Sequence, residues 1–228
     1  MEHSNLIFKE DYIRKRLLPL DSPSRLSLKD DKFVNSAITF LIVPYKDKPY
    51  DLVLIRRTHS DMDKHSGEMS FPGGKQDPQD YTLEETALRE CEEEIGVPRK
   101  KIHVLGSFDD HITPQKFIIT PIVCFIDQKQ KLLKCDDEVH EILKIPIKFF
   151  VNKKSYRERT YELNGDTIGV GKFNYKDSNG KKYVIFGATC HIIATYVDLV
   201  HNAGLVKPSV RRLSPADFNA RDEKIKKE

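Results

Sequence analysis

The sequence lacks an apolar run long enough to cross a membrane. Its longest mostly apolar stretch, AITFLIVPY at residues 37–45, falls well short of the roughly 20 residues that a bilayer-spanning helix needs. Residues 1–20 hold no apolar core of a secretion signal, and Glu2, Glu10 and Asp11 argue against a transit peptide. We therefore expect an intracellular protein without a membrane partner.

Cysteine pairs and a large excess of one charge are also missing. The four cysteines, Cys91, Cys124, Cys135 and Cys190, lie far apart without a C-x-x-C pair, which argues against a zinc site or a disulfide framework and favours buried reduced thiols. Lys and Arg total 38 against 35 Asp and Glu, a net charge of +3. This balance argues against nucleic acid as a partner, so an anionic ligand must be bound by a local group of residues.

What is present suits one globular domain with extensions. The 228 residues are 39% apolar and 32% charged, as in ordinary folded proteins. We expect an N-terminal extension at residues 1–32, a main domain at residues 33–206 and a polar C-terminal tail at residues 207–228.

Strand and helix patterns mix along the main domain without strict alternation. Strands are predicted at residues 33–45, 51–57, 101–108, 116–126, 158–163 and 181–187, the first two as a hairpin. A loop leading into a short helix is expected at 136–151, and an apolar helix at 188–204 that Gly204 ends. A further short helix around Leu17, Leu18 and Leu20 is expected to cap the core. This mixture predicts an α/β fold with a mixed sheet covered on both faces.

One predicted helix has clear start and stop signals. Thr82 and Glu85 form a capping-box pattern that predicts a start near Leu83, and Gly96 is placed to end the helix. The apolar stripe expected to pack on the sheet consists of Ala87, Leu88, Cys91 and Ile95.

Four carboxylates crowd the border of that stripe, at Glu90, Glu92, Glu93 and Glu94. Like charges three or four positions apart on a helix repel by roughly 0.2–0.5 kcal/mol per pair, so a bound cation is expected to offset the repulsion. Mg²⁺ takes a few carboxylates together with phosphate oxygens, and an upstream glycine pair, Gly73-Gly74, lets the backbone approach a ligand. The pattern indicates metal-assisted attack of water on a diphosphate; the alternative is a solvated acidic helix.

The stretch from Gly74 to Val97, GKQDPQDYTLEETALRECEEEIGV, resembles the signature of the Nudix hydrolases, G-x5-E-x7-R-E-U-x-E-E-x-G-U, where U is apolar. Residues 89–97 match the second half position by position. In the first half Asp80 stands in place of the glutamate, and one extra residue separates it from Arg89.

That departure is similar to the coenzyme A diphosphatase branch of the superfamily. A second signature of this branch, L-L-T-x-R-S followed by a basic residue, a glycine and F-P-G-G, is matched by VLIRRT at 53–58 and KHSGEMSFPGG at 64–74. Arg57 is the matching arginine, whereas Asp63 stands where a further arginine is expected. The resemblance covers about residues 33–204 and implies an α/β/α sandwich with a mixed central sheet, so that residues 33–206 form the Nudix domain.

The resemblance also implies site residues. Glu93 and Glu94 are expected as ligands of Mg²⁺ or Mn²⁺, Glu90 as a ligand or general base, and Gly73 as a ligand through its carbonyl. Arg89 is expected to hold the cluster in place by fork-like pairing.

Residues outside the signature are candidates with alternatives. Glu138 is expected to supply a further carboxylate to the metal or the attacking water; Asp136, Asp137 and Glu141 are its rivals. Arg57, Lys64 and His65 are candidates for binding substrate phosphates, with ordinary surface charge as the alternative. His191, in the apolar helix, is expected to be a satisfied core histidine rather than a ligand.

The implied function is hydrolysis of coenzyme A or acyl-CoA to 3′,5′-ADP and (acyl-)4′-phosphopantetheine. The alternatives are another Nudix substrate, such as NADH, ADP-ribose or a capped RNA end, and a non-catalytic Nudix-fold binding module. A homodimer is left open. The family resemblance favours the peroxisome, although the chain ends in Ile-Lys-Lys-Glu rather than a Ser-Lys-Leu signal; the cytoplasm is the other expectation.

Overall fold

The computed structural model describes residues 6–59 and 67–218. In chain order the elements are α1 (Glu10–Arg14), β1 (Val34–Val43), β2 (Asp51–Arg57), β3 (Met69–Ser70), β4 (Gly73–Lys75), α2 (Leu83–Ile95), the 3₁₀ turn η2 (Arg99–Lys101), β5 (His103–Ser107), β6 (His111–Ile112), β7 (Phe117–Phe125), β8 (Val139–Pro146), α3 (Ile147–Phe150), the 3₁₀ turn η3 (Lys153–Ser155), β9 (Tyr156–Leu163), β10 (Asp166–Lys176), β11 (Lys182–Phe186) and α4 (Gly187–His201).

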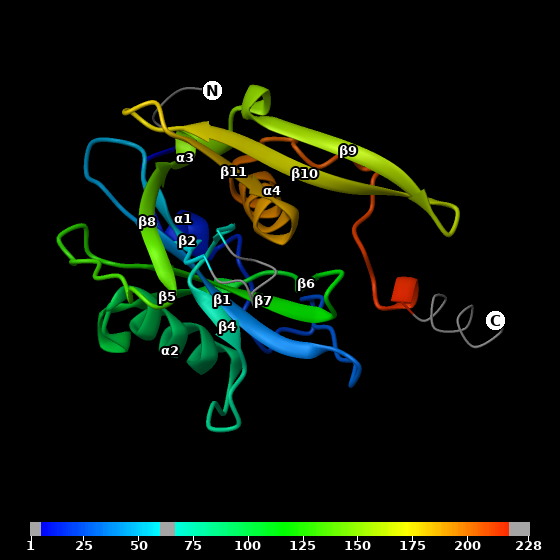
Figure 1. The fold of residues 1–228 in the computed structure, drawn as a ribbon, viewed down its shortest axis with the longest axis horizontal. Coiled ribbons are helices and arrows are strands. Elements are labelled where there is room, and N and C mark those ends of the chain that lie inside the picture. Colours follow the sequence, from blue (N-terminus) through cyan, green and yellow to red (C-terminus); the bar gives the residue numbers. More distant parts are fainter. Residues whose placement is uncertain (1–5, 60–66, 219–228) are drawn as a thin grey trace.

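An eight-stranded mixed sheet built around β1 forms the centre of the fold (Figure 1). Its main order is β3-β2-β1-β7-β5, with β4, β6 and β8 paired to β1, β7 and β2. Strands β1 and β7 run parallel from Val34↔Phe117 to Ile42↔Phe125, whereas β1 and β2 form the expected antiparallel hairpin. The predicted α/β fold with a mixed central sheet is therefore confirmed.

The two faces of β1 serve two cores, because side chains alternate along a strand. Leu41 and Val43 belong to the core that contains Ala87, Cys91 and Ile95 of α2. Phe40 and Ile42 point to the other core, which contains the buried side of α4. The helices α2 and α4 thus cover opposite faces of the sheet, as an α/β/α sandwich requires.

A second sheet lies beyond α4 and adds a layer to the sandwich. Strands β9, β10 and β11 form a three-stranded antiparallel sheet that packs on α4 (Figure 1). The sequence patterns do not predict β10, since its Gly169 and Gly171 weaken a strand signal. Packing explains both glycines: a Cβ would lie 2.4 Å from Val210 at Gly169, and 2.6 Å from the Tyr156 hydroxyl at Gly171.

Three local predictions need correction. The expected loop at residues 136–151 contains strand β8, whose burial alternates and which pairs with β2 from Asp51↔Pro146 onward. The last helix ends at His201, and its C-cap is Asn202 in the left-handed conformation rather than Gly204. The N-terminal helix is α1 and precedes Leu17; Leu18 instead forms an isolated bridge with Ser107.

Described parts of both flanking segments pack on the main domain. Leu6, Ile13 and Leu17 join the core under α4, and Phe218 packs edge-to-face on Phe33 with ring centroids 5.2 Å apart. The boundaries at residues 32 and 206 remain a proposal about domain organisation.

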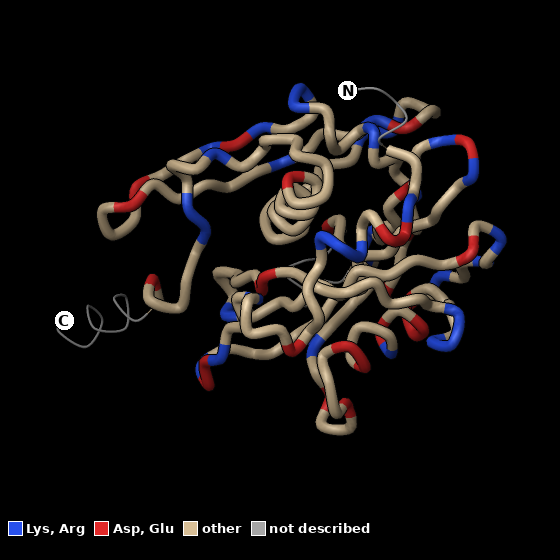
Figure 2. The backbone as a smooth tube through the Cα atoms, turned by 180° about the vertical axis from the view of Figure 1, so that it is seen from behind, with Lys and Arg blue, Asp and Glu red and all other residues tan. Residues whose placement is uncertain are grey.

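The charged residues are of both signs throughout the chain, and the four cysteines, all within the described residues, form no disulfide. Lys and Arg alternate with Asp and Glu along the chain (Figure 2). Cys91, Cys124 and Cys190 are buried, Cys135 is half-buried, and all four are free thiols. Within the described residues, no helix is long and apolar enough to span a membrane.

Removal of the predicted capping box tests what fixes the start of α2. Thr82 Oγ1 accepts a hydrogen bond from Glu85 N at 3.1 Å, and Glu85 Oε2 accepts one from Thr82 N at 3.2 Å. Thr82→Ala is expected to lower the free energy of unfolding by about 1 kcal/mol, as measured by urea denaturation. Thr160→Ala, at an exposed position of β9, is the control and should change it by less than about 0.5 kcal/mol; equal effects would contradict the capping role.

Candidate active site

The orientation of α2 places its acidic residues against β4. Cys91 and Ile95 on its apolar stripe are fully buried, and Thr39 Oγ1 of β1 donates to the carbonyl of Ala87 at 2.7 Å. These contacts fix the rotation of the helix about its axis. Glu90 and Glu94, one turn apart, consequently face the Gly73-Gly74 pair.

Both glycines allow β4 to lie close to its neighbours. Gly73 has φ 153°, and a Cβ there would lie 2.4 Å from the carbonyl oxygen of Ala37 on β1. A Cβ on Gly74 would lie 2.5 Å from the carboxyl group of Glu90. The glycine pair therefore lets the carboxylates of α2 sit directly against the backbone of β4.

Glu94 is the most buried acid of the cluster, with 1% of its surface exposed. Its Oε2 accepts a hydrogen bond from Gly73 N at 2.9 Å, and Arg57 Nη1 lies 3.8 Å from its Oε1. Burial raises the pKa of Glu94 to about 8, and the charges of Glu90 and Glu138 add to this, whereas the Gly73 N–H and Arg57 oppose it. In the absence of a further cation, the site therefore disfavours the ionised form of Glu94.

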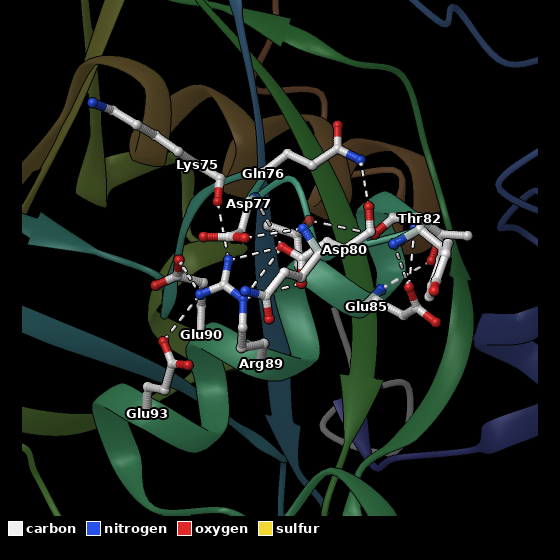
Figure 3. Close-up of polar contacts among 12 residues, drawn as sticks. Lys75, Gln76, Asp77, Asp80, Thr82, Glu85, Arg89, Glu90 and Glu93 are labelled. Carbon is white, nitrogen blue, oxygen red and sulfur yellow. Dashed lines mark hydrogen bonds and ion pairs between the residues drawn. The ribbon is translucent and has the colours of Figure 1, made fainter.

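Arg89 holds the outer acids of the cluster (Figure 3). Its Nη1 donates to Glu90 Oε1 at 2.8 Å and to Glu93 Oε2 at 3.0 Å, while its Nη2 donates to Asp80 Oδ2 at 2.8 Å and to the carbonyl of Lys75 at 3.1 Å. Burial raises the pKa of Glu90, and the hydrogen bond from Arg89 opposes that shift.

Asp80, which departs from the signature, is the anchor of Arg89. It is buried and accepts hydrogen bonds from both Nε and Nη2 of Arg89. These hydrogen bonds lower the pKa of Asp80 to about 2. The structure thus pairs Asp80, the first acid of the signature, with Arg89 and not with Glu94.

Among the later acids, Glu138 lies where its charge acts on the cluster, because it raises the pKa of both Glu90 and Glu94. Its rival Glu141 is bound elsewhere, to Lys181 Nζ at 2.6 Å and to the Tyr183 hydroxyl at 2.9 Å. Asp136 pairs with Lys134. Position therefore favours Glu138 over these two acids.

A cavity of about 620 Å³ opens beside the glycine pair. At this end it is lined by Arg57, Glu68, Gly73, Gly74 and Lys75, and it extends between β6, β7, β10 and the start of α4. Its volume is typical of small-molecule sites. Another cavity of about 660 Å³ lies beside α1 and β5, and its lining contains none of the predicted site residues.

The structure brings Arg57 to this cavity, but Lys64 and His65 lie outside the described residues. Sequence reasoning missed Lys75 and Glu68, which line the same end. Lys75 directly follows the glycine pair, so its position in the chain was the available signal. His191 is a satisfied buried histidine as expected, since its Nε2 accepts from Gly171 N at 2.8 Å.

The donor set suits a hard divalent cation, although no ready-made cage is formed. Within residues 6–59 and 67–218, no three His, Cys, Asp or Glu side chains are grouped as a metal site. Arg89 and the Gly73 N–H donate hydrogen bonds to the carboxylates of α2. The crowding of Glu90, Glu93 and Glu94 against one arginine nevertheless fits Mg²⁺ or Mn²⁺, which prefer carboxylate oxygens.

Comparisons with known proteins find relatives of this chain. Residues 35–158 match the sequence model of the NUDIX domain family. Over 189 residues the chain is 31% identical to the peroxisomal coenzyme A diphosphatase NUDT7 of Mus musculus, covering 82% of this chain and 76% of that protein. A segment of 113 residues is 37% identical to the uncharacterized Nudix hydrolase NudL of Yersinia enterocolitica, covering 50% of this chain and 58% of that relative.

Among solved structures, a MutT/nudix family protein from Enterococcus faecalis aligns with a TM-score of 0.45 and 15% identity, over 88% of this chain and 76% of that chain.

Asp80→Asn tests the anchoring of Arg89. Because the folded-state pKa of Asp80, about 2, lies below the usual value of 3.8, the ionised carboxylate stabilises the fold above about pH 4, and this stabilisation is lost as the pH falls towards 2. At pH 7 the variant should be less stable by roughly 2 kcal/mol, and the difference should shrink between pH 4 and pH 2, as followed by urea denaturation.

Asp47→Asn, at an exposed position before β2, is the control and should have little effect at either pH. A deficit in Asp80→Asn that stays constant down to pH 2 would argue against the ion pair.

Proposed function

The chain belongs to the NUDIX domain family and is a Nudix hydrolase, an enzyme class that acts on phosphorus anhydrides; from this premise we propose that it cleaves the diphosphate of coenzyme A or acyl-CoA. The products are 3′,5′-ADP and (acyl-)4′-phosphopantetheine. One observation carries the proposal: the buried Glu94 lies with Glu90 directly behind the glycine pair that lines one end of the cavity.

In the proposed reaction, Glu90, Glu93 and Glu94 would hold Mg²⁺ or Mn²⁺ together with the carbonyl of Gly73, and Glu138 would supply a further oxygen. When bound, such a cation would offset part of the charge of the diphosphate and lower the pKa of a water molecule. Arg57 and Lys75 offer charge-assisted hydrogen bonds to the diphosphate at the end of the cavity that they line.

Glu90 or Glu138 takes a proton from the attacking water as general base. A bond forms between the water oxygen and one phosphorus atom, and the bond from that phosphorus to the bridging oxygen breaks. Arg89 does not enter this step; it keeps Glu90 and Glu93 oriented through the hydrogen bonds at 2.8 and 3.0 Å.

The choice of coenzyme A rests on likeness to the mouse relative, whose name states that substrate and a peroxisomal location. A peroxisomal location belongs to the same proposal and can be examined with a fluorescent fusion of the full chain. The substrate is tested by product identification with coenzyme A, 3′-dephospho-CoA, NADH and ADP-ribose in the presence of Mg²⁺ or Mn²⁺. Turnover of NADH or ADP-ribose without turnover of coenzyme A would overturn the choice.

Glu94→Gln tests the role of the buried acid, because it keeps the side-chain shape and removes one charge. The variant should lose activity on coenzyme A by about 100-fold or more at saturating Mg²⁺, since polarisation of water and phosphate is weakened. Steady-state turnover is the measurement.

Glu92→Gln is the matched control from the same helix, since Glu92 is half-buried and pairs with Arg99 Nε at 3.0 Å rather than with Arg89. It should retain wild-type turnover. Equal turnover in the wild type and both variants would sink the metal-cluster mechanism.

Metal binding should also raise thermal stability, because a ligand that binds the folded state stabilises it by RT ln(1 + [L]/Kd). At 100 times Kd this amounts to about 2.7 kcal/mol, or a rise in Tm of roughly 5–10 °C for a chain of this size. Melting curves with and without millimolar Mn²⁺ measure the shift, which should largely disappear in Glu94→Gln and persist in Glu92→Gln. An unchanged wild-type Tm would count against the site.

A further inference from the structure

The end of the cavity away from the glycine pair contains two histidines in contact. His111 on β6 and His191 on α4 both line it, with ring centroids 5.4 Å apart and planes at 62°. They come from elements far apart in the chain. Neither belongs to the signature that predicts the metal cluster, so their contact is a property of the tertiary structure.

Both imidazoles are held neutral. Burial lowers the pKa of His191 to about 2, and the charge of Arg212 acts in the same direction. Burial likewise lowers the pKa of His111 to about 4, again assisted by Arg212. At physiological pH this part of the cavity therefore offers hydrogen-bonding groups without a positive charge.

The two histidines differ in their hydrogen bonds. His191 Nε2 accepts from Gly171 N at 2.8 Å, so its role is satisfied within the protein. The His111 ring makes no hydrogen bond to any other residue within 6–59 and 67–218, although it lines the cavity. A neutral imidazole has one donor and one acceptor, and His111 keeps both available to a ligand.

The lining of the cavity beyond the glycine pair is mostly apolar. It includes Ile112, Ile119, Ile168, Val170, Phe186 and Leu213, and its polar members besides the two histidines are Thr113, Gln115, Tyr161 and Thr189. The charged lining residues Arg57, Glu68 and Lys75 stand at the other end, beside the glycine pair. The cavity therefore suits a ligand that has an anionic group at one end and an uncharged, partly apolar arm at the other.

We propose that His111 is a specificity-determining residue, which hydrogen-bonds the amide-bearing arm of the substrate while the diphosphate lies at the glycine pair. This inference rests on the proposed function and deepens it. An amide has both a donor and an acceptor, which complement the two nitrogens of a neutral imidazole. A second nucleotide would instead bring phosphates or a ribose into a mostly apolar region. The cation whose charge acts on His111, Arg212, is paired with Glu158 and is not among the cavity-lining residues. His191 contacts the His111 ring in a T-shaped arrangement.

The probe for this contact is 4′-phosphopantetheine, which carries the amide-bearing arm and a single phosphate. Its affinity for the wild type and for His111→Phe is measured by isothermal titration calorimetry in the presence of Mn²⁺. The phenylalanine ring keeps the bulk and removes the hydrogen bonds, so binding should weaken about 10-fold. His111→Gln restores a donor and an acceptor and should recover most of the affinity.

Two controls separate this contact from general damage. Binding of 3′,5′-ADP, which has no such arm, should be the same in wild type and His111→Phe. His103→Phe replaces an exposed histidine on β5 that stacks on Phe125 and is not among the cavity-lining residues; it should bind 4′-phosphopantetheine as the wild type does.

The kinetic counterpart is a rise of about 10-fold in KM for coenzyme A in His111→Phe with kcat within about 2-fold, because the arm is bound equally in ground and transition states. Equal affinity of wild type and His111→Phe for 4′-phosphopantetheine, or no binding to the wild type, would overturn the role of His111. Binding that depends on His111 without turnover of coenzyme A would instead overturn only the proposed reaction.

Discussion

The close approach of α2 to the Gly73-Gly74 pair is the constraint on which the site depends. A Cβ on Gly74 would lie 2.5 Å from the carboxyl group of Glu90, and Gly73 N donates to Glu94 at 2.9 Å. This approach buries Glu94 and brings Glu90 and Glu94 against the glycine pair, which itself lines one end of the cavity. The buried stripe of α2 on the sheet keeps the helix in this position, so core packing and site geometry have the same origin.

Such packing concentrates negative charge at the acids of α2. The positive charge of Arg89 offsets part of it by pairing with several of these groups. One guanidinium contacts Glu90, Glu93 and Asp80. Asp80 in turn accepts hydrogen bonds from Nε and Nη2 of the arginine, so the arginine is held in place and shares its single charge with a third acid. The remaining charge around buried Glu94 is what a divalent cation would offset.

The other end of the cavity differs in composition, because residues of both sheets line it. The second sheet, α4 and the segment with Leu213 enclose a region where histidines are uncharged. A single cavity therefore presents charge at the glycine pair and neutral hydrogen-bonding groups beyond it. Because the two ends of the cavity differ in charge, a substrate with its diphosphate near the α2 acids would place an uncharged arm at the other end.

Local signals in the sequence determined α2, its capping box, its apolar stripe and the crowding of Glu90, Glu93 and Glu94, because each depends on residues within a few turns. They also indicated the mixed sheet through runs of apolar residues. Only the tertiary structure decided that Asp80 anchors Arg89, that residues 139–146 form a strand, and that β10 accommodates Gly169 and Gly171 under Val210 and Tyr156. It also decided the contact of His111 with His191. These features depend on partners distant in the chain, which local periodicity does not specify.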